Sequence, residues 1–159
     1  MSYTGQAPPL TSDEIASFLR ENNIARICTH NEDGTIHAIP VSYCYINGQI
    51  VIGSIASSRK TRNVKRNNSV SVLIDSEKEQ GILIYGKAKV EYDNVCQTAL
   101  SVWEKAYSQA PRDKVERLVK AYLDTVKYVI IRITPRHVVT FDIGKDDVYN
   151  NLVRTYLQE

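Results

Sequence analysis

Short runs of apolar residues alternate with turn residues through the first half of the chain, a pattern typical of strands with one buried face. The pattern predicts strands at residues 24–30, 35–46, 49–54, 69–75 and 81–92. Asn47 and Gly48 form a strong hairpin signal, so the strands on either side of them should pair in antiparallel fashion. Pro40 lacks a backbone N–H and therefore indicates an edge, a bulge or a place where something other than a strand approaches.

Helical periodicity flanks and interrupts these strands. Thr11 and Glu14 form a capping box, which predicts a helix that continues to Asn22–Asn23. Apolar residues at helical spacing predict further helices within an insert at 93–125 and at 146–157, and a serine-rich loop opens into about two helical turns at residues 59–66. Residues 127–133 and 138–143 should be extended around Pro135. We expect residues 1–10 to form a flexible arm and residues 11–159 a single domain.

The order of these elements predicts the fold class. Hairpins follow one another without regular alternation of strand and helix, and the helices precede, interrupt or follow them. This order favours a mainly β protein with α-helices, built as a closed or nearly closed antiparallel barrel with the helices on its outside.

Composition narrows the function. The formal net charge is +2, and five basic residues fall within residues 59–66, so the rest of the chain is net negative. Local positive charge suits a small anion better than a long polyanion, and a nucleic-acid partner is not favoured. The three cysteines lack C-x-x-C spacing and the N-terminus lacks a signal-like apolar run, so we expect a reduced, soluble, cytoplasmic protein without structural zinc or a membrane span.

The stretch from Ser54 to Asn67 carries the candidate chemistry. A strand leads through a serine-rich loop into a helix whose first turn contains Arg59 and Lys60. Backbone N–H groups at a helix N-terminus and the helix dipole both favour anions. We therefore predict that Ser54, Ser58, Arg59 and Lys60 bind a phosphate carried by a cofactor. The alternative is an ordinary solvated helix face, because the spacing matches no Walker loop and no G-x-G-x-x-G occurs.

No catalytic or metal-binding constellation is found in the sequence. His37 fits an ordinary barrel or surface histidine, and Trp103 and Tyr107 fit core or interface anchors. If the protein is an enzyme, a bound cofactor carries its chemistry.

Several segments resemble the pyridoxamine 5'-phosphate oxidase-like family of flavin-binding split barrels. The resemblance runs from about residue 13 to residue 143. It is carried by Asp33–Tyr43, Asn47–Ser54, Ser58-Arg59-Lys60, Asn63, Asn67–Ile74, Tyr85–Ala88 and Ile133–Asp142.

The resemblance implies a six-stranded split β-barrel that forms a homodimer with FMN at the subunit interface. It implies that Ser54, Ser58, Arg59 and Lys60 bind the FMN phosphate. It also implies that the segment Pro40, Val41, Ser42 and Tyr43 runs beside the flavin ring with mainly backbone hydrogen bonds, and that Gln80 lies near the ring. The implied function is that of an FMN-dependent oxidoreductase whose small-molecule substrate is unknown.

Three alternatives remain open from the sequence. The protein is a non-catalytic flavin carrier or sensor, a relative that binds haem or a deazaflavin, or a nucleic-acid-binding module that uses the helix at 59–66. Residues 145–159 lack the arginine and histidine with which the family's vitamin B6 enzymes bind pyridoxal phosphate, so we do not expect vitamin B6 synthesis.

Overall fold

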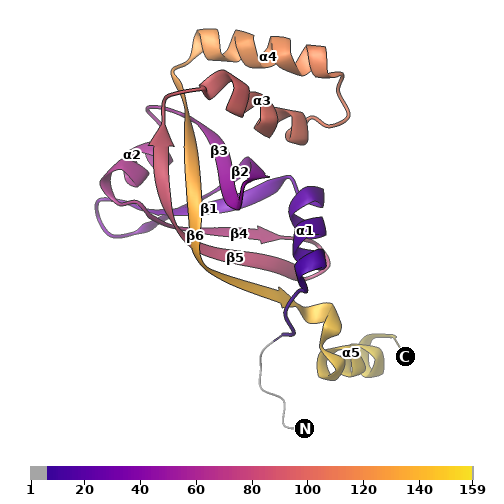
Figure 1. The fold of residues 1–159 in the computed structure, drawn as a ribbon. Helices are drawn as coiled ribbons and strands as arrows, with labels where there is room; N and C mark the ends of the chain where they lie inside the picture. Colours follow the sequence, from indigo (N-terminus) through magenta and orange to yellow (C-terminus); the bar gives the residue numbers. More distant parts are fainter. Residues whose placement is uncertain (1–6, 159) are drawn as a thin grey trace.

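Six strands form a closed antiparallel barrel in the computed structural model, which describes residues 7–158 (Figure 1). Around the barrel the strand order is β1-β2-β3-β6-β5-β4. The strands are β1 (Ile24–His30), β2 (Ile36–Ile46), β3 (Gln49–Ile55), β4 (Ser69–Asp75), β5 (Gln80–Glu91) and β6 (Tyr128–Asp142). The predicted six-stranded antiparallel barrel with peripheral helices is confirmed.

The barrel is split between β2 and β3. These strands pair only close to their hairpin, where Tyr43–Ile46 lie opposite Gln49–Ile52. Beyond that point, residues 36–42 pair with β1 alone and residues 53–55 pair with β6 alone. The two strands therefore diverge, and one side of β2 around Pro40 has no partner strand within residues 7–158.

Pro135 lies inside one long strand rather than between two. β6 pairs with β5 along its whole length, but the register shifts between Tyr85 and Gly86, which lie opposite His137 and Pro135. Arg136 is therefore the extra residue of a β-bulge. A bulge tolerates the missing N–H of a proline, and this explains why the strand continues where the sequence suggested an interruption.

Helix α1 (Ser12–Glu21) begins with the predicted capping box. Thr11 Oγ1 accepts a hydrogen bond from Glu14 N at 3.3 Å, and Glu14 Oε2 accepts one from Thr11 N at 2.6 Å. Residues 1–6 of the predicted flexible arm lie outside the described residues. The described part packs on the barrel, since Leu10 is buried and its N–H donates to Thr140 Oγ1 at 2.9 Å.

Two helices cover the outer face of β2, β3 and β6. They are α3 (Val95–Ala106) and α4 (Arg112–Thr125), and Figure 1 shows them stacked at one end of the molecule. Alternate residues of β3 face opposite sides: Ile50 and Ile52 pack in the barrel interior, whereas Val51 packs against α3. The chain leaves the barrel after β5, forms these helices and returns as β6.

Lys105 links α3 to the C-terminal end of α1 and to β2. Its ammonium donates hydrogen bonds to the carbonyl oxygens of Leu19 at 2.7 Å and Asn22 at 2.6 Å, at the C-terminal end of α1. It also lies 3.6 Å from the centre of the Tyr43 ring. A cation is favourable both at a helix C-terminus and over an aromatic face, so this contact fixes the position of α3.

The chain ends in short helical segments at the opposite end of the molecule from α3 and α4 (Figure 1). A 3₁₀ turn (Ile143–Lys145) precedes α5 (Asp147–Val153), and a π-helical turn (Arg154–Gln158) follows it. Within residues 7–158, no helix is both long enough and apolar enough to cross a membrane.

Candidate functional site

Helix α2 (Arg59–Arg66) lies across one end of the barrel. Thr61, Asn63 and Val64 are its buried residues, whereas Arg59 and Arg62 are exposed. The predicted basic helix therefore has an exposed and a buried face, but its buried face is mainly polar, because two of the three buried residues are polar. The exposed positions of α2 fit the solvated helix face that was the alternative interpretation. Lys60, in the first turn, is only partly exposed.

Three hydroxyl groups meet where β3 runs into α2. Ser54 Oγ lies 2.9 Å from Ser58 Oγ and 2.8 Å from Thr61 Oγ1, and Ser58 Oγ lies 3.0 Å from Thr61 Oγ1. Thr61 Oγ1 also donates to the carbonyl oxygen of Ile55 at 3.0 Å. Ser54 is only 2% exposed, so its hydroxyl serves this internal network and does not reach the surface.

Ser58 is the member of this network that can face a ligand. It is the N-cap of α2, and its Oγ accepts a hydrogen bond from Thr61 N at 3.4 Å. If Thr61 donates to Ile55 and Ser54 donates to Thr61, the proton of Ser58 makes the 2.9 Å bond to Ser54, so Ser58 donates to a ligand only by turning away from Ser54. The sequence did not point to Thr61, although a threonine three residues after an N-cap serine is a signal that could have done so.

At the start of α2, Lys60 is the cation whose surroundings most favour a bound anion. Its ammonium is half-buried, and burial lowers the pKa of Lys60 from its usual 10.5. Among the residues that the structure describes, Lys60 has no ion-pair or hydrogen-bond partner on its side chain, and the first turn of α2 contains no acidic residue. A half-buried charge without a partner is costly, so this position favours a bound anion.

Asn63 joins α2 to the barrel. Its side-chain amide donates to Thr29 Oγ1 at 3.0 Å and to Asn31 Oδ1 at 2.9 Å, while its oxygen accepts from Arg66 at 2.9 Å. Asn63 is 3% exposed and Thr29 is fully buried. Since asparagine is a poor helix former, its place in a short helix is the sequence signal for such a side-chain role.

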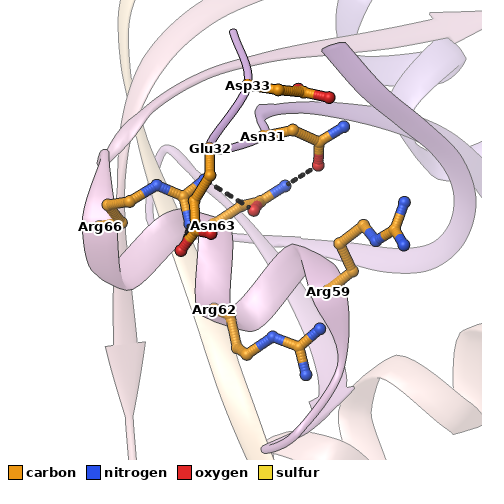
Figure 2. Close-up of a pocket in the computed structure, with 7 residues that line it drawn as sticks. All are labelled: Asn31, Glu32, Asp33, Arg59, Arg62, Asn63 and Arg66. Atoms are coloured by element: carbon orange, nitrogen blue, oxygen red, sulfur yellow. Dashed lines mark hydrogen bonds and ion pairs between the residues drawn. The ribbon is translucent and has the colours of Figure 1, made fainter. Parts of the chain in front are cut away.

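A polar pocket of about 390 Å³ lies on the outer side of α2 (Figure 2). It is lined by Asn31, Glu32, Asp33, Arg59, Arg62, Asn63 and Arg66. The guanidinium of Arg66 donates a hydrogen bond to the carbonyl oxygen of His30 at 2.6 Å, and that of Arg62 donates one to the carbonyl oxygen of Ser57 at 2.9 Å. The side chain of Arg59 makes no hydrogen bond within residues 7–158, and Figure 2 shows its guanidinium extending free of the helix. Arg59 is therefore the available arginine of the pocket.

A second pocket, of about 190 Å³, lies where β2 and β3 diverge; we call it the β2–β3 pocket. The barrel side is formed by Val41, Ser42 and Gly53, and the opposite side by residues of α3 and by Tyr128 at the start of β6. The remaining lining residues are Val102, Trp103, Ala106 and Tyr107. Gly53 and Ser54 are neighbours on β3 with opposite orientations, so this strand links the pocket to the hydroxyl network.

The other predicted site residues lie apart from these two pockets. Pro40 is exposed beside the gap between β2 and β3. Tyr43 is fully buried and points into the barrel, where its hydroxyl donates to the carbonyl oxygen of Leu19 at 3.0 Å, so its side chain is not available to a ligand. Gln80 lies opposite Asp142, at the far end of β6 from Ser54, and donates to the Asp142 carboxylate at 2.9 Å.

Comparisons with solved structures agree with this architecture. A conserved hypothetical protein from Mycobacterium tuberculosis superposes with a TM-score of 0.76 and 24% identity, over 90% of this chain and 91% of that one. A FAD-binding protein from Mesorhizobium loti superposes with a TM-score of 0.57 and 18% identity, over 84% and 94% of the two chains. The haem storage protein HutZ from Vibrio cholerae superposes with a TM-score of 0.61 and 17% identity, over 81% of this chain and 94% of that one. At these identities the likeness establishes the fold alone.

The family follows from the sequence comparison. No curated protein matches the chain. The sequence pattern that defines the family described as pyridoxamine 5'-phosphate oxidase, however, matches residues 11–141, which include the whole of α2 and all six strands except Asp142, the last residue of β6. The chain therefore belongs to the pyridoxamine 5'-phosphate oxidase family.

Proposed function

We propose that this protein binds FMN, with the phosphate at the N-terminus of α2 and the flavin ring in the β2–β3 pocket. The observation that carries the proposal is the half-buried ammonium of Lys60, which lies in the first turn of α2 without a counter-charge among the described residues. A phosphate there would supply the missing charge.

The phosphate site combines three kinds of donor. The backbone N–H groups of Arg59 and Lys60 begin the helix and have no acceptor within it. The hydroxyl of Ser58 donates to the phosphate when it turns from Ser54, its partner in the network, toward the ligand. The guanidinium of Arg59 and the ammonium of Lys60 add charge-assisted hydrogen bonds, which are about twice as strong as neutral ones.

The ring site uses the gap in the barrel. Residues 36–42 of β2 have a partner strand on one side only, so backbone groups of Pro40, Val41 and Ser42 are available to the polar edge of a ring. Proline contributes a carbonyl group but no N–H. This arrangement supports the backbone-based recognition that the family resemblance implies for this segment.

The chemistry that FMN supplies when bound is hydride acceptance and donation, and we propose that the protein is an oxidoreductase. Neither pocket is lined by a histidine or a cysteine, and only the polar pocket contains carboxylates, Glu32 and Asp33. The protein's part is therefore to hold the phosphate, orient the ring and limit the access of water to it.

A second copy of the chain completes the proposed site. Large apolar side chains on four strands remain exposed by 40–55%, namely Ile24, Ile36, Tyr85, Val138 and Val139. Exposed apolar surface of this kind supports association of two protomers. Within one chain Gln80 and Ser54 pair with opposite ends of β6, which supports the proposal that a glutamine beside the ring comes from the second copy.

Haem is the alternative that the comparison with HutZ raises, because that protein is a haem storage protein. Protein-bound haem iron usually has an axial side-chain ligand such as histidine, cysteine, methionine or tyrosine. The β2–β3 pocket offers only Tyr107 and Tyr128 from this set, and Tyr128 is engaged by Trp103. A phosphate anchor next to the pocket favours FMN.

The test compares FMN with riboflavin, which has the same ring without the phosphate. Wild-type protein should bind FMN at least about tenfold more tightly, because each charge-assisted hydrogen bond contributes about 1.5–3 kcal/mol. The double variant Arg59→Ala/Lys60→Ala should lose most of this preference, whereas Arg62→Ala/Lys65→Ala, with the same loss of charge on the same helix, should keep it. Equal binding of the two ligands by the wild type would refute the phosphate site. Absorption spectra with haem and with a deazaflavin identify those ligands if FMN does not bind.

A further inference from the structure

We propose that Trp103, Tyr107 and Tyr128 form an aromatic wall that covers one face of the bound ring, and that the Tyr128 hydroxyl donates a hydrogen bond to it. The ligand class is a planar heteroaromatic ring with an acceptor atom at its edge. The inference rests on the proposed function and assigns the residues of α3 and β6 that select the ring.

The β2–β3 pocket has two sides of different character. One side is backbone and small side chains, from Val41, Ser42 and Gly53, and the other side is aromatic. Aromatic side chains facing a backbone surface across a narrow space suit a flat ligand, because stacking uses both faces of the ring. Tyr107 remains 50% exposed, so the wall is still accessible to a ligand in the structure described.

Gly53 lets the wall come close to the barrel. A Cβ at this position would overlap the hydroxyl of Tyr128 and would lie 2.5 Å from its Cζ and 2.6 Å from its Cε1. Only glycine therefore allows the Tyr128 ring to lie directly on β3. This contact places the phenol hydroxyl against β3, where both residues line the pocket.

The hydroxyl proton of Tyr128 has no hydrogen-bond acceptor among the described residues. Its oxygen accepts a hydrogen bond from Trp103 Nε1 at 3.2 Å, and within residues 7–158 no acceptor is found for its own hydrogen. Burial raises the pKa of Tyr128, so the phenol keeps its proton at neutral pH. A phenol that accepts from an indole and lines a pocket is suited to donate to a ring nitrogen or carbonyl oxygen in that pocket.

Packing behind the wall holds it in place. The Trp103 ring lies 5.3 Å from the ring of Tyr122 and 6.0 Å from that of Tyr107, while Tyr122 and Tyr128 meet edge to face at 5.7 Å. Tyr122 supports the cluster from α4 without lining the pocket. Tyr122 is therefore a matched control for Trp103 and Tyr128, which do line the pocket.

The experiment uses flavin fluorescence, which an indole or phenol in contact with the ring quenches. Trp103 is the only tryptophan of the chain. We expect Trp103→Leu to bind riboflavin at least about fivefold more weakly than the wild type, consistent with a stacking contribution on the order of 1 kcal/mol, and to leave the bound flavin more fluorescent. Tyr128→Phe should weaken binding about two- to tenfold, as expected for one lost hydrogen bond, and should shift the flavin absorption band. Tyr122→Phe should match the wild type in each measurement.

Riboflavin separates this inference from the phosphate site. If the wild type binds neither FMN nor riboflavin, the proposed function itself fails. If the wild type binds both but Trp103→Leu and Tyr128→Phe retain its affinity and quenching, the aromatic wall is refuted while the phosphate site stands. If Trp103→Leu does not fold, as judged by circular dichroism, Tyr128→Phe decides, because it removes only the hydroxyl oxygen.

Discussion

The side-chain amide of Asn63 donates a hydrogen bond to the hydroxyl of Thr29, 3.0 Å away and fully buried. This bond ties the helix that carries the basic residues to the first strand of the barrel, across 34 positions of sequence. The position of the α2 N-terminus therefore depends on a polar contact in the interior.

Asn63→Ala should be clearly destabilising. It leaves a buried hydroxyl with a weaker set of partners, and such a loss costs about 1–3 kcal/mol of unfolding free energy. Urea unfolding followed by circular dichroism measures the difference. Arg62→Ala, on the exposed side of the same helix, should change stability by less than about 0.5 kcal/mol. A loss in Asn63→Ala no larger than that of the control would contradict the assigned role.

Gly53→Ala should displace Tyr128 from β3. The added methyl group overlaps the Tyr128 hydroxyl, and overpacking of this kind costs about 1–3 kcal/mol. In a double-mutant cycle with Tyr128→Ala, the cost of Gly53→Ala should largely disappear, which gives a coupling free energy of about 0.5–3 kcal/mol. Additive effects of the two substitutions would mean that the rings do not meet as described.

The preference for FMN over riboflavin should fall at high pH. Burial lowers the pKa of Lys60 from 10.5, so this lysine loses its charge at a lower pH than an ordinary lysine does. Below that pKa the ammonium attracts the phosphate, and above it the attraction is lost. Taking the ratio of the two dissociation constants cancels any titration of the flavin ring itself. Lys60→Arg should keep the preference across the same range, because arginine stays protonated.

Acid should weaken the fold partly through Glu14. Its carboxylate accepts hydrogen bonds from Lys145 and from the Thr11 backbone, which lower the pKa of Glu14 from 4.5 to about 2. A carboxyl group with a lower pKa in the folded state stabilises the fold above pH 4.5. That contribution disappears as the pH falls toward 2. Urea midpoints at pH 5 and pH 3 should therefore differ less in Glu14→Gln than in the wild type.

Local signals predicted most of the fold. The capping box at Thr11 and the hairpin at Asn47-Gly48 depend on neighbours in sequence, and the structure contains both. Pro40 indicated an interrupted edge, and β2 indeed loses its partner strand on one side near this residue. Pro135 was harder to interpret, because a bulge depends on the partner strand, which lies far away in sequence.

The candidate site was predicted only where it is local. Ser58, Arg59 and Lys60 are consecutive, so their meeting at a helix N-terminus follows from the sequence itself. Trp103 and Tyr128 reach Gly53 because α3 packs on the outer face of β2 and β3, and no periodicity specifies which face a helix will cover. The burial of Ser54 behind Ser58 likewise depends on the closure of the barrel by α2.

The two points where the helices α3 and α4 join the barrel are close together. Glu91, the last residue of β5, lies opposite Ile130, and β6 begins only two residues earlier, at Tyr128. A tight hairpin turn could in principle connect these strand ends and leave the barrel register unchanged. The helical pair therefore enters and leaves the chain at one corner of the barrel, although α3 also packs against β2, β3 and β6. Under the proposed function, the aromatic wall on this pair and the phosphate anchor at the serine-arginine-lysine turn lie on separate stretches of sequence and can be varied independently.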